Sequence, residues 1–177
     1  MATDLGQTVR VSSGELESEV VRLHGAAFEG LFRYAMALVR NRELAEDAIQ
    51  ESFLRYVIAR IQGQCIVNGR AWLYRVLRNQ LLDARKKNDL VVDGAIDELV
   101  HRPDGQQDPE VLMRAQELYK VVLDSVTTRE LECLQLRFEG LRYEEIATVL
   151  NIRSGTVGAM IARAVKKLQR AVNRERS

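Results

Sequence analysis

The sequence predicts an all-α protein made of two small helical domains joined by a flexible acidic linker. Its composition favours helix, because Leu, Ala, Arg and Glu are frequent while only two of the 177 residues are proline. Before residue 87, three stretches repeat apolar residues every three or four positions, as amphipathic helices do. Further on, residues 143–168 fit a helix-turn-helix almost position by position. A chain of this length can bury one or two small cores.

The first domain is expected over residues 14–87, after a disordered arm at residues 1–13. Ser12 and Glu15 have the spacing of a capping box, so a first helix is expected from about Gly14. Asn41 can cap a second helix over roughly 42–61, and a polar loop leads to a third helix over roughly 70–86. The expected core residues are Leu16, Val20, Leu23, Ala27, Leu31, Ala35 and Leu38 in the first helix, Ala45, Ala48, Ile49, Phe53, Val57 and Ile61 in the second, and Leu73, Val76, Leu77, Leu81 and Ala84 in the third.

Residues 88–108 lack a sustained period and contain two glycines, one proline and six acids, which predicts a linker. The second domain is expected over residues 109–177. Pro109 suits the first turn of a helix that runs to about Ser125. Thr127 and Glu130 then repeat the capping-box spacing before a helix that is expected to end at Gly140.

The helix-turn-helix completes the second domain. Asn151 occupies the turn, where the chain must adopt a positive φ that few residues other than glycine tolerate. The small side chain of Ala147 allows the two helix axes to approach closely. The other expected core residues are Ile146, Leu150, Ile152, Val157 and Met160. Such a unit usually lays its second helix in the major groove of DNA, although an ordinary antiparallel helix pair is the alternative.

The net charge of +1 hides a patterned distribution of charge. Residues 68–87 carry a local charge of +5, residues 88–108 carry −5, and residues 153–177 carry +6. Two basic segments separated by an acidic one suggest two sites for a polyanion, joined by a segment that avoids DNA. A mixed solvated surface remains the alternative, because charge alone does not decide between them.

Several classes of protein and site are disfavoured. No apolar run approaches the roughly 20 residues that a membrane span needs, and the first residues are too polar for a secretory signal. Cys65 and Cys133 lack metal-ligand spacing, and His24 and His101 have no ligand partners nearby, so we expect reduced thiols in a cytoplasm and no metal. Without a Gly-rich phosphate loop or a paired nucleophile and base, we expect neither a cofactor nor an enzyme.

Three motifs resemble those of bacterial RNA polymerase sigma factors of the extracytoplasmic-function type. The segment LFRYAMALVRNRELAEDAIQESFLRYV is similar to the family's core-binding segment, and RAWLYRVLRNQLLDARKK to its −10 promoter segment. The segment GLRYEEIATVLNIRSGTV is similar to its −35 reader. Each motif is moderately specific, and the three in this order are highly specific. The resemblance covers roughly residues 25–87 and 109–170.

The resemblance implies a polymerase-binding face on the second helix, formed by Asp47, Gln50, Glu51, Leu54 and Arg55. These residues lie within two turns, at spacings that place them on neighbouring faces. An acidic and polar edge beside an exposed leucine suits docking on a basic partner helix, and the resemblance implies that this partner is the clamp helix pair of core RNA polymerase. The residues alone would equally produce a solvated helix face.

Opening a promoter requires capture of an unstacked single strand, for which arginines beside amide or aromatic side chains are suited. Trp72 and Tyr74 can contribute such an aromatic, although Trp72 is expected in the core. The expected contacts to the −10 element are Asn68, Arg70, Arg75, Arg78, Asn79 and Arg85.

The recognition helix departs from the family pattern, because Gly158, Ala159 and Met160 stand where relatives commonly carry basic or serine residues. Hydrogen-bonded readout of bases is therefore weakened, and the two small residues would let the helix backbone approach the groove. The remaining expected DNA contacts, mostly to phosphates, are Arg153, Ser154, Thr156, Arg163 and Lys166. We expect recognition of the −35 element to depend more on DNA shape than on base edges.

The sequence thus predicts a sigma factor that binds core RNA polymerase and promoter DNA. The family also implies an anti-sigma partner, and it places the acidic linker in the RNA path of the polymerase, for which a flexible tether is the alternative. The alternative function is a dimeric helix-turn-helix regulator acting on duplex operators, in which Val165, Leu168 and Val172 would pair with a second copy.

Overall fold

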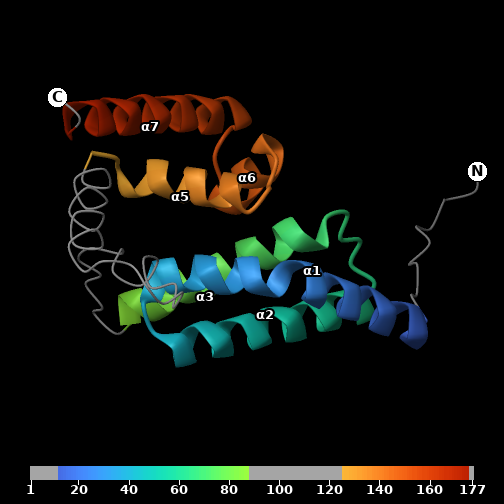
Figure 1. Cartoon of the computed structure of the whole chain (residues 1–177). Helices are drawn as coiled ribbons and strands as arrows, with labels where there is room; N and C mark the ends of the chain where they lie inside the picture. Colours follow the sequence, from blue (N-terminus) through green and yellow to red (C-terminus); the bar gives the residue numbers. More distant parts are fainter. Residues whose placement is uncertain (1–11, 88–124, 176–177) are drawn as a thin grey trace, which may run out of the picture. The chain divides into compact units, whose positions relative to one another are not determined.

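The computed structural model describes residues 12–87 and 125–175, and these residues form six α-helices (Figure 1). The all-α prediction is confirmed. The chain divides into two units, Met1–Leu90 and Val91–Ser177. The expected arm up to residue 11, the acidic linker and the helix expected from Pro109 lie outside the described residues.

Unit 1 is a bundle of α1 (Ser13–Val39), α2 (Arg42–Ile61) and α3 (Gly69–Lys87), and each helix packs against the other two (Figure 1). Their apolar faces meet in one core, which three tyrosines help to fill. The ring of Tyr34 meets the ring of Tyr74 edge-on, with 5.4 Å between the centroids. The largest fully buried side chains of this unit are Tyr34, Tyr56, Tyr74, Leu31, Ile49, Leu73, Leu77 and Leu81.

The ends of α1 and α2 follow from local capping. The Ser12 hydroxyl accepts a hydrogen bond from the backbone N–H of Glu15 at 3.3 Å, and the Glu15 carboxylate accepts from the Ser12 N–H at 3.0 Å. Asn41 caps α2, since its side-chain oxygen accepts from the Leu44 N–H at 2.9 Å. Both predicted helix starts are therefore confirmed to within a residue.

The prediction that Ile61 lies in the core of this unit is wrong. Ile61 is 69% exposed, because it is the last residue of α2 and lies at the end of the bundle. Val20, Leu23, Val57, Val76 and Ala84 are only half-buried, whereas the other expected core residues of α1, α2 and α3 are buried.

Close packing at the start of α3 requires glycine. A Cβ added to Gly69 would lie 2.8 Å from the hydroxyl oxygen of Tyr56 and 3.0 Å from a methyl carbon of Leu23. The Tyr56 ring cannot move away easily, because it is buried and its hydroxyl donates a hydrogen bond to the Glu19 carboxylate of α1. Arg60 of α2 pairs with the same carboxylate at 3.1 Å. The start of α3 is thereby fixed against both other helices.

Unit 2 contains α5 (Thr128–Phe138), α6 (Tyr143–Leu150) and α7 (Ser154–Glu175). Helix α7 packs along α5 and also contacts α6, which lies at one end of that pair (Figure 1). The predicted capping box of α5 is confirmed, because the Thr127 hydroxyl and the Glu130 carboxylate each accept a backbone N–H of the other residue. The buried core residues include Cys133, Leu136, Leu141, Ile146, Val149, Leu150, Val157, Ile161 and Ala164.

Candidate nucleic-acid interface

The turn between α6 and α7 has the backbone that the sequence predicts. Asn151 ends α6 in the left-handed region with φ of 54° and ψ of 51°, and its N–H donates to the Ala147 carbonyl. The Ile152 N–H also donates to that carbonyl, at 3.0 Å. Ala147 and Val157 are buried where the two helices meet. Helix α7 is therefore held at a fixed angle to α6, with its outer face exposed.

The exposed side of α7 has two parts. Near its start, Arg153 and Ser154 are exposed and Thr156 is half-buried. Further along, Arg163 and Lys166 are exposed, so all five predicted DNA contacts of this unit have at least part of their surface open to solvent. Between these groups the side is smooth, because Gly155, Ala159 and Ala162 are its other exposed residues up to Arg163.

Two residues of α7 lie differently from their expected places. Gly158 is half-buried, and a Cβ added there would meet the ring of Tyr143 at 3.6 Å, an ordinary contact distance. Gly158 thus faces α6 rather than an open groove. Met160, expected as a core residue, is half-buried, with its sulfur 3.7 Å from the sulfur of buried Cys133.

A carboxylate of α5 contacts the basic residues of α7. The Lys167 ammonium donates to Glu130 Oε2 at 2.7 Å, and Arg163 Nε lies 3.9 Å from Glu130 Oε1. The hydrogen bond and charge of Lys167, together with hydrogen bonds from Thr127, lower the pKa of Glu130 to about 2. This cluster is not evident from the sequence, since 37 residues separate Glu130 from Lys167 and only the capping-box spacing marks the glutamate.

In unit 1 the structure distinguishes among the predicted single-strand contacts of α3. Arg75 and Asn79 are exposed and lie one helical turn apart. Arg70, Arg78 and Arg85 are half-buried, and the Arg70 guanidinium lies over the Tyr74 ring, 5.9 Å from its centroid. Arg75 and Asn79 are thus the two most accessible members of the predicted set.

Three residues considered for the single-strand site, among them the predicted contact Asn68, have roles within the fold. The Asn68 side-chain oxygen accepts a hydrogen bond from the Ala71 N–H at 3.0 Å, so this residue caps the start of α3. Tyr74 is fully buried, which removes it as a stacking partner for a base. Trp72 is half-buried and meets the Tyr56 ring edge-on at 5.5 Å.

The predicted polymerase-binding face lies on the outer side of α2. Asp47, Gln50, Leu54 and Arg55 are exposed, and Glu51 is half-buried and pairs with Arg55 at 2.7 Å. Leu54 is 54% exposed, as expected, and Ile58 one turn later is 44% exposed. The acidic and polar residues are thus continued by an apolar strip of Leu54 and Ile58, of which only Leu54 was expected from the sequence.

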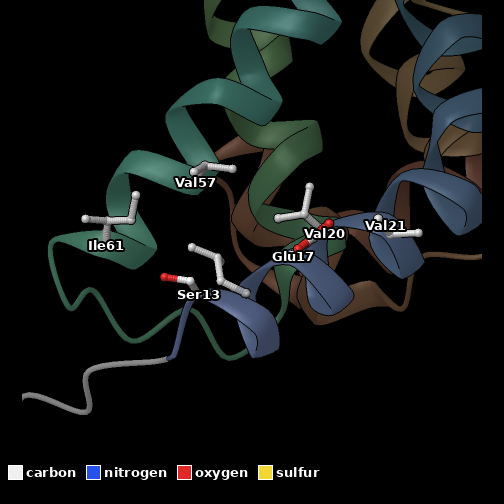
Figure 2. A pocket seen from close by; sticks show the side chains of 7 residues that line it. Ser13, Glu17, Val20, Val21, Val57 and Ile61 are labelled. Carbon is white, nitrogen blue, oxygen red and sulfur yellow. The ribbon is translucent and has the colours of Figure 1, made fainter.

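An apolar groove lies between the start of α1 and the end of α2 (Figure 2). It has a volume of about 670 Å³, and Ile61 accounts for part of its wall. The lining residues are Ser13, Leu16, Glu17, Val20, Val21, Val57 and Ile61. No sequence signal marked this groove, because residues such as Val20 and Val57 repeat at the spacing of core residues.

Other kinds of site are not found in the part of the chain that the structure describes. Within residues 12–87 and 125–175, no three His, Cys, Asp or Glu residues are placed to hold a metal ion. Each helix in these ranges is too short or too polar to span a bilayer. Cys65 is an exposed free thiol, and burial raises the pKa of the free thiol of Cys133.

Comparisons with known proteins agree with the two-unit arrangement. Residues 29–91 match the family model for sigma-70 region 2, and residues 116–168 match that for sigma-70 region 4. In a crystal structure, the sigma factor RpoE is bound to the anti-sigma factor NepR from Bartonella quintana; RpoE has a similar fold. That likeness has a TM-score of 0.61 at 21% identity and covers 89% of this chain and 96% of the other.

Two curated relatives carry the assignment further. The ECF RNA polymerase sigma factor SigE of Mycolicibacterium smegmatis is 30% identical over 85% of this chain, which spans 59% of the length of SigE. The ECF RNA polymerase sigma factor SigL of Mycobacterium tuberculosis is 30% identical over 78% of this chain and 80% of its own length. With regions 2 and 4 matched in order and a helix-turn-helix in place, the chain belongs to the ECF sigma factors of the sigma-70 family.

Proposed function

We propose that this chain binds core RNA polymerase and directs it to promoters. In this proposal α2 contacts the polymerase, α3 binds a melted strand at the −10 element, and α7 binds duplex DNA at the −35 element. The observation that carries the proposal is the presence of separate accessible faces on these three helices. Leu54, Arg75 and Lys166 mark the faces, and all three are exposed.

The division of labour follows from the chemistry of the two DNA states. A single strand offers unpaired bases and phosphates together, which suits Asn79 beside Arg75 on α3. An intact duplex offers a major groove wide enough for a helix, which suits α7 with its smooth side of small residues. Arg153 and Lys166 would then neutralise phosphates and fix the register of the helix on the duplex.

Two further partners or settings belong to the proposal. The structural neighbour RpoE was solved with an anti-sigma factor, which supports an inhibitor of that kind for this chain as well. A protein that works with core polymerase acts in the bacterial cytoplasm, and the free thiols of Cys65 and Cys133 are compatible with that compartment.

The alternative of a dimeric regulator has less support. It requires an apolar strip on α7 for a second copy, and Val165 is 40% exposed. Leu168 and Val172 are already half-buried within the chain itself. The α7 helix of a second copy would therefore contact one well-exposed apolar side chain, whereas the dimer hypothesis requires three.

Reconstitution with core polymerase tests the proposed function. The wild-type chain should associate with the core enzyme and produce defined start sites on a genomic promoter library. The double variant Arg75→Ala, Asn79→Ala should lower strand opening, followed by permanganate reactivity, by about tenfold or more, as loss of one or two base contacts implies. Arg22→Ala, which removes an exposed arginine of α1, is the matched control and should behave as wild type. A wild-type chain that neither associates with core enzyme nor selects start sites overturns the proposal.

A further inference from the structure

Glu130 occupies an unusual position at the junction of α5 and α7. Its side chain is 5% exposed, although it lies at the start of a helix where a capping carboxylate is usually solvated. Oε2 accepts hydrogen bonds from the Thr127 N–H at 2.9 Å, the Thr127 hydroxyl at 3.0 Å and the Lys167 ammonium at 2.7 Å. Oε1 lies 3.9 Å from Nε of Arg163.

This carboxylate stays ionised throughout the physiological range, because its pKa of about 2 lies well below its ordinary value of 4.5. Removing Lys167 from it would leave a buried negative charge with less compensation, which is costly. The ammonium is therefore held against α5, and the Lys167 side chain is 37% exposed. Arg163 is held less firmly, since its contact is longer and its side chain is 62% exposed.

The neighbouring lysine differs from Lys167 in the part of the chain that the structure describes. Lys166 is exposed, and within the described residues no ion pair is found for it. Lys166 and Lys167 are consecutive on α7 and project about 100° apart around the helix axis. One of two adjacent lysines is thus available to a phosphate, whereas the other is neutralised within the protein.

We propose that Glu130 withholds Lys167, and in part Arg163, from DNA phosphates and so limits the sequence-independent component of duplex binding by α7. The inference rests on the proposed function of α7 as the duplex-binding helix. Phosphate contacts add affinity for any sequence, so each cation withheld lowers binding to non-promoter DNA. Glu130 acts as a positioning residue, and its influence reaches DNA through Lys167 and Arg163.

The variant Glu130→Gln removes the charge and retains the cap, since glutamine also serves at this position of a capping box. The matched control is Glu15→Gln, which removes one charge from the equivalent position of α1. There Ser12 makes hydrogen bonds of 3.0, 2.8 and 3.3 Å, close to the 2.9, 3.0 and 3.3 Å of Thr127. Both variants raise the net charge equally, so a difference between them reports on the cations of α7.

The measurement is the salt dependence of binding of the full-length chain to a labelled duplex without promoter sequence, followed by fluorescence anisotropy. For B-DNA the slope of log K against log salt changes by about 0.9 for each phosphate newly neutralised. Glu130→Gln should therefore steepen the slope by about 0.9 or more, which is roughly a 3.5-fold larger loss of affinity over a fourfold rise in salt. Glu15→Gln should leave the slope at its wild-type value.

A mutant cycle on the two lysines separates charge release from altered packing. In the wild-type background, Lys166→Gln should lower the slope by about 0.9, whereas Lys167→Gln should leave it nearly unchanged. In the Glu130→Gln background, by contrast, Lys167→Gln should lower the slope by about 0.9. If circular dichroism shows that Glu130→Gln is unfolded, the comparison of Lys166→Gln with Lys167→Gln in the wild-type background still tests whether Lys167 is withheld from DNA.

Three results would overturn the inference: an unchanged slope in folded Glu130→Gln, an equal loss of slope in the two single lysine variants, or no duplex binding by Glu130→Gln. Start-site selection with core polymerase is measured separately, so failure of the proposed function is distinguishable from failure of this inference. A chain that initiates normally but shows an unchanged slope would sink the inference alone.

Discussion

Single side chains in this protein often serve two parts of the fold at once, and Glu130 is the clearest case. It caps the helix on which it stands and pairs with a lysine on another helix. In unit 1, Glu19 of α1 likewise joins two helices. Its carboxylate accepts a hydrogen bond from the Tyr56 hydroxyl of α2 and pairs with Arg60 of α2. The hydrogen bond from Tyr56 and the pairing with Arg60 lower the pKa of Glu19 despite its partial burial.

The lowered pKa of Glu130 predicts a specific dependence of stability on pH. A carboxylate whose pKa falls from 4.5 to about 2 on folding stabilises the protein fully above about 4.5, and that contribution is lost as the pH falls towards 2. We therefore expect Glu130→Gln to be less stable than wild type at neutral pH, with the difference shrinking between about pH 4.5 and pH 2. Urea unfolding followed by far-ultraviolet circular dichroism measures this difference. A difference that stays constant over that range would contradict the prediction.

Residue-scale predictions from the sequence succeeded where exposure follows from helical periodicity. Leu54 is exposed as expected, and Arg75 and Asn79 of the predicted single-strand contacts are exposed as well. The predictions for single residues were incomplete where a side chain has a partner within the fold. Asn68 caps α3, and Tyr74 lies in the core because its aromatic ring packs against Tyr34, contacts that no one-dimensional spacing reveals.

Helix boundaries were the most predictable elements, because their signals are local. Each capping side chain accepts a hydrogen bond from a backbone N–H three residues later in the sequence. These pairs are Ser12 with Glu15, Asn41 with Leu44, and Thr127 with Glu130. The ends of helices were less predictable where they run past their neighbours. Ile61 continues the apolar period of α2, but the bundle ends before it, and its exposure contributes to the groove beside α1.

The turn of the helix-turn-helix offers a test at the scale of the element. Because Asn151 has a positive φ, we expect Asn151→Val to lower the free energy of unfolding of unit 2 by roughly 1–2 kcal/mol. Asn151→Gly should be close to neutral, since glycine adopts this conformation without a steric penalty. Urea titration followed by circular dichroism compares the pair, and both variants remove the same side chain. Equal losses in the two would show that the Asn side chain, rather than its backbone angle, stabilises the turn.

At the scale of the whole molecule, the sequence predicted two units with different tasks, because the charge pattern and motif order are properties of long segments. The Glu130–Lys167 pair and the groove of unit 1 were beyond it, since both depend on which helices pack together. Glu130 and Lys167 are 37 residues apart in the sequence. The groove is lined by the start of α1 and the end of α2, which meet only because the two helices pack against each other.

Association with polymerase supplies the prediction at this scale. Leu54→Glu places a charge in the centre of the proposed contact and should weaken binding to core enzyme by about tenfold or more, as loss of a well-placed apolar contact does. Its stability should change little, because Leu54 is 54% exposed. Val67→Glu is the matched control, since Val67 is 95% exposed and lies in the loop before α3 rather than on α2. Surface plasmon resonance with immobilised core enzyme compares them, and equal weakening by both variants would argue against the α2 face.

The edge-on contact between Trp72 and Tyr56 has a practical consequence. Trp72 is the only tryptophan of the chain and lies in the first turn of α3, three residues before the exposed Arg75. Its emission is thus an intrinsic optical reporter confined to unit 1. Quenching or a spectral shift on adding an oligonucleotide would follow strand capture in real time without any attached dye. Unit 2 holds no tryptophan and would contribute no tryptophan emission.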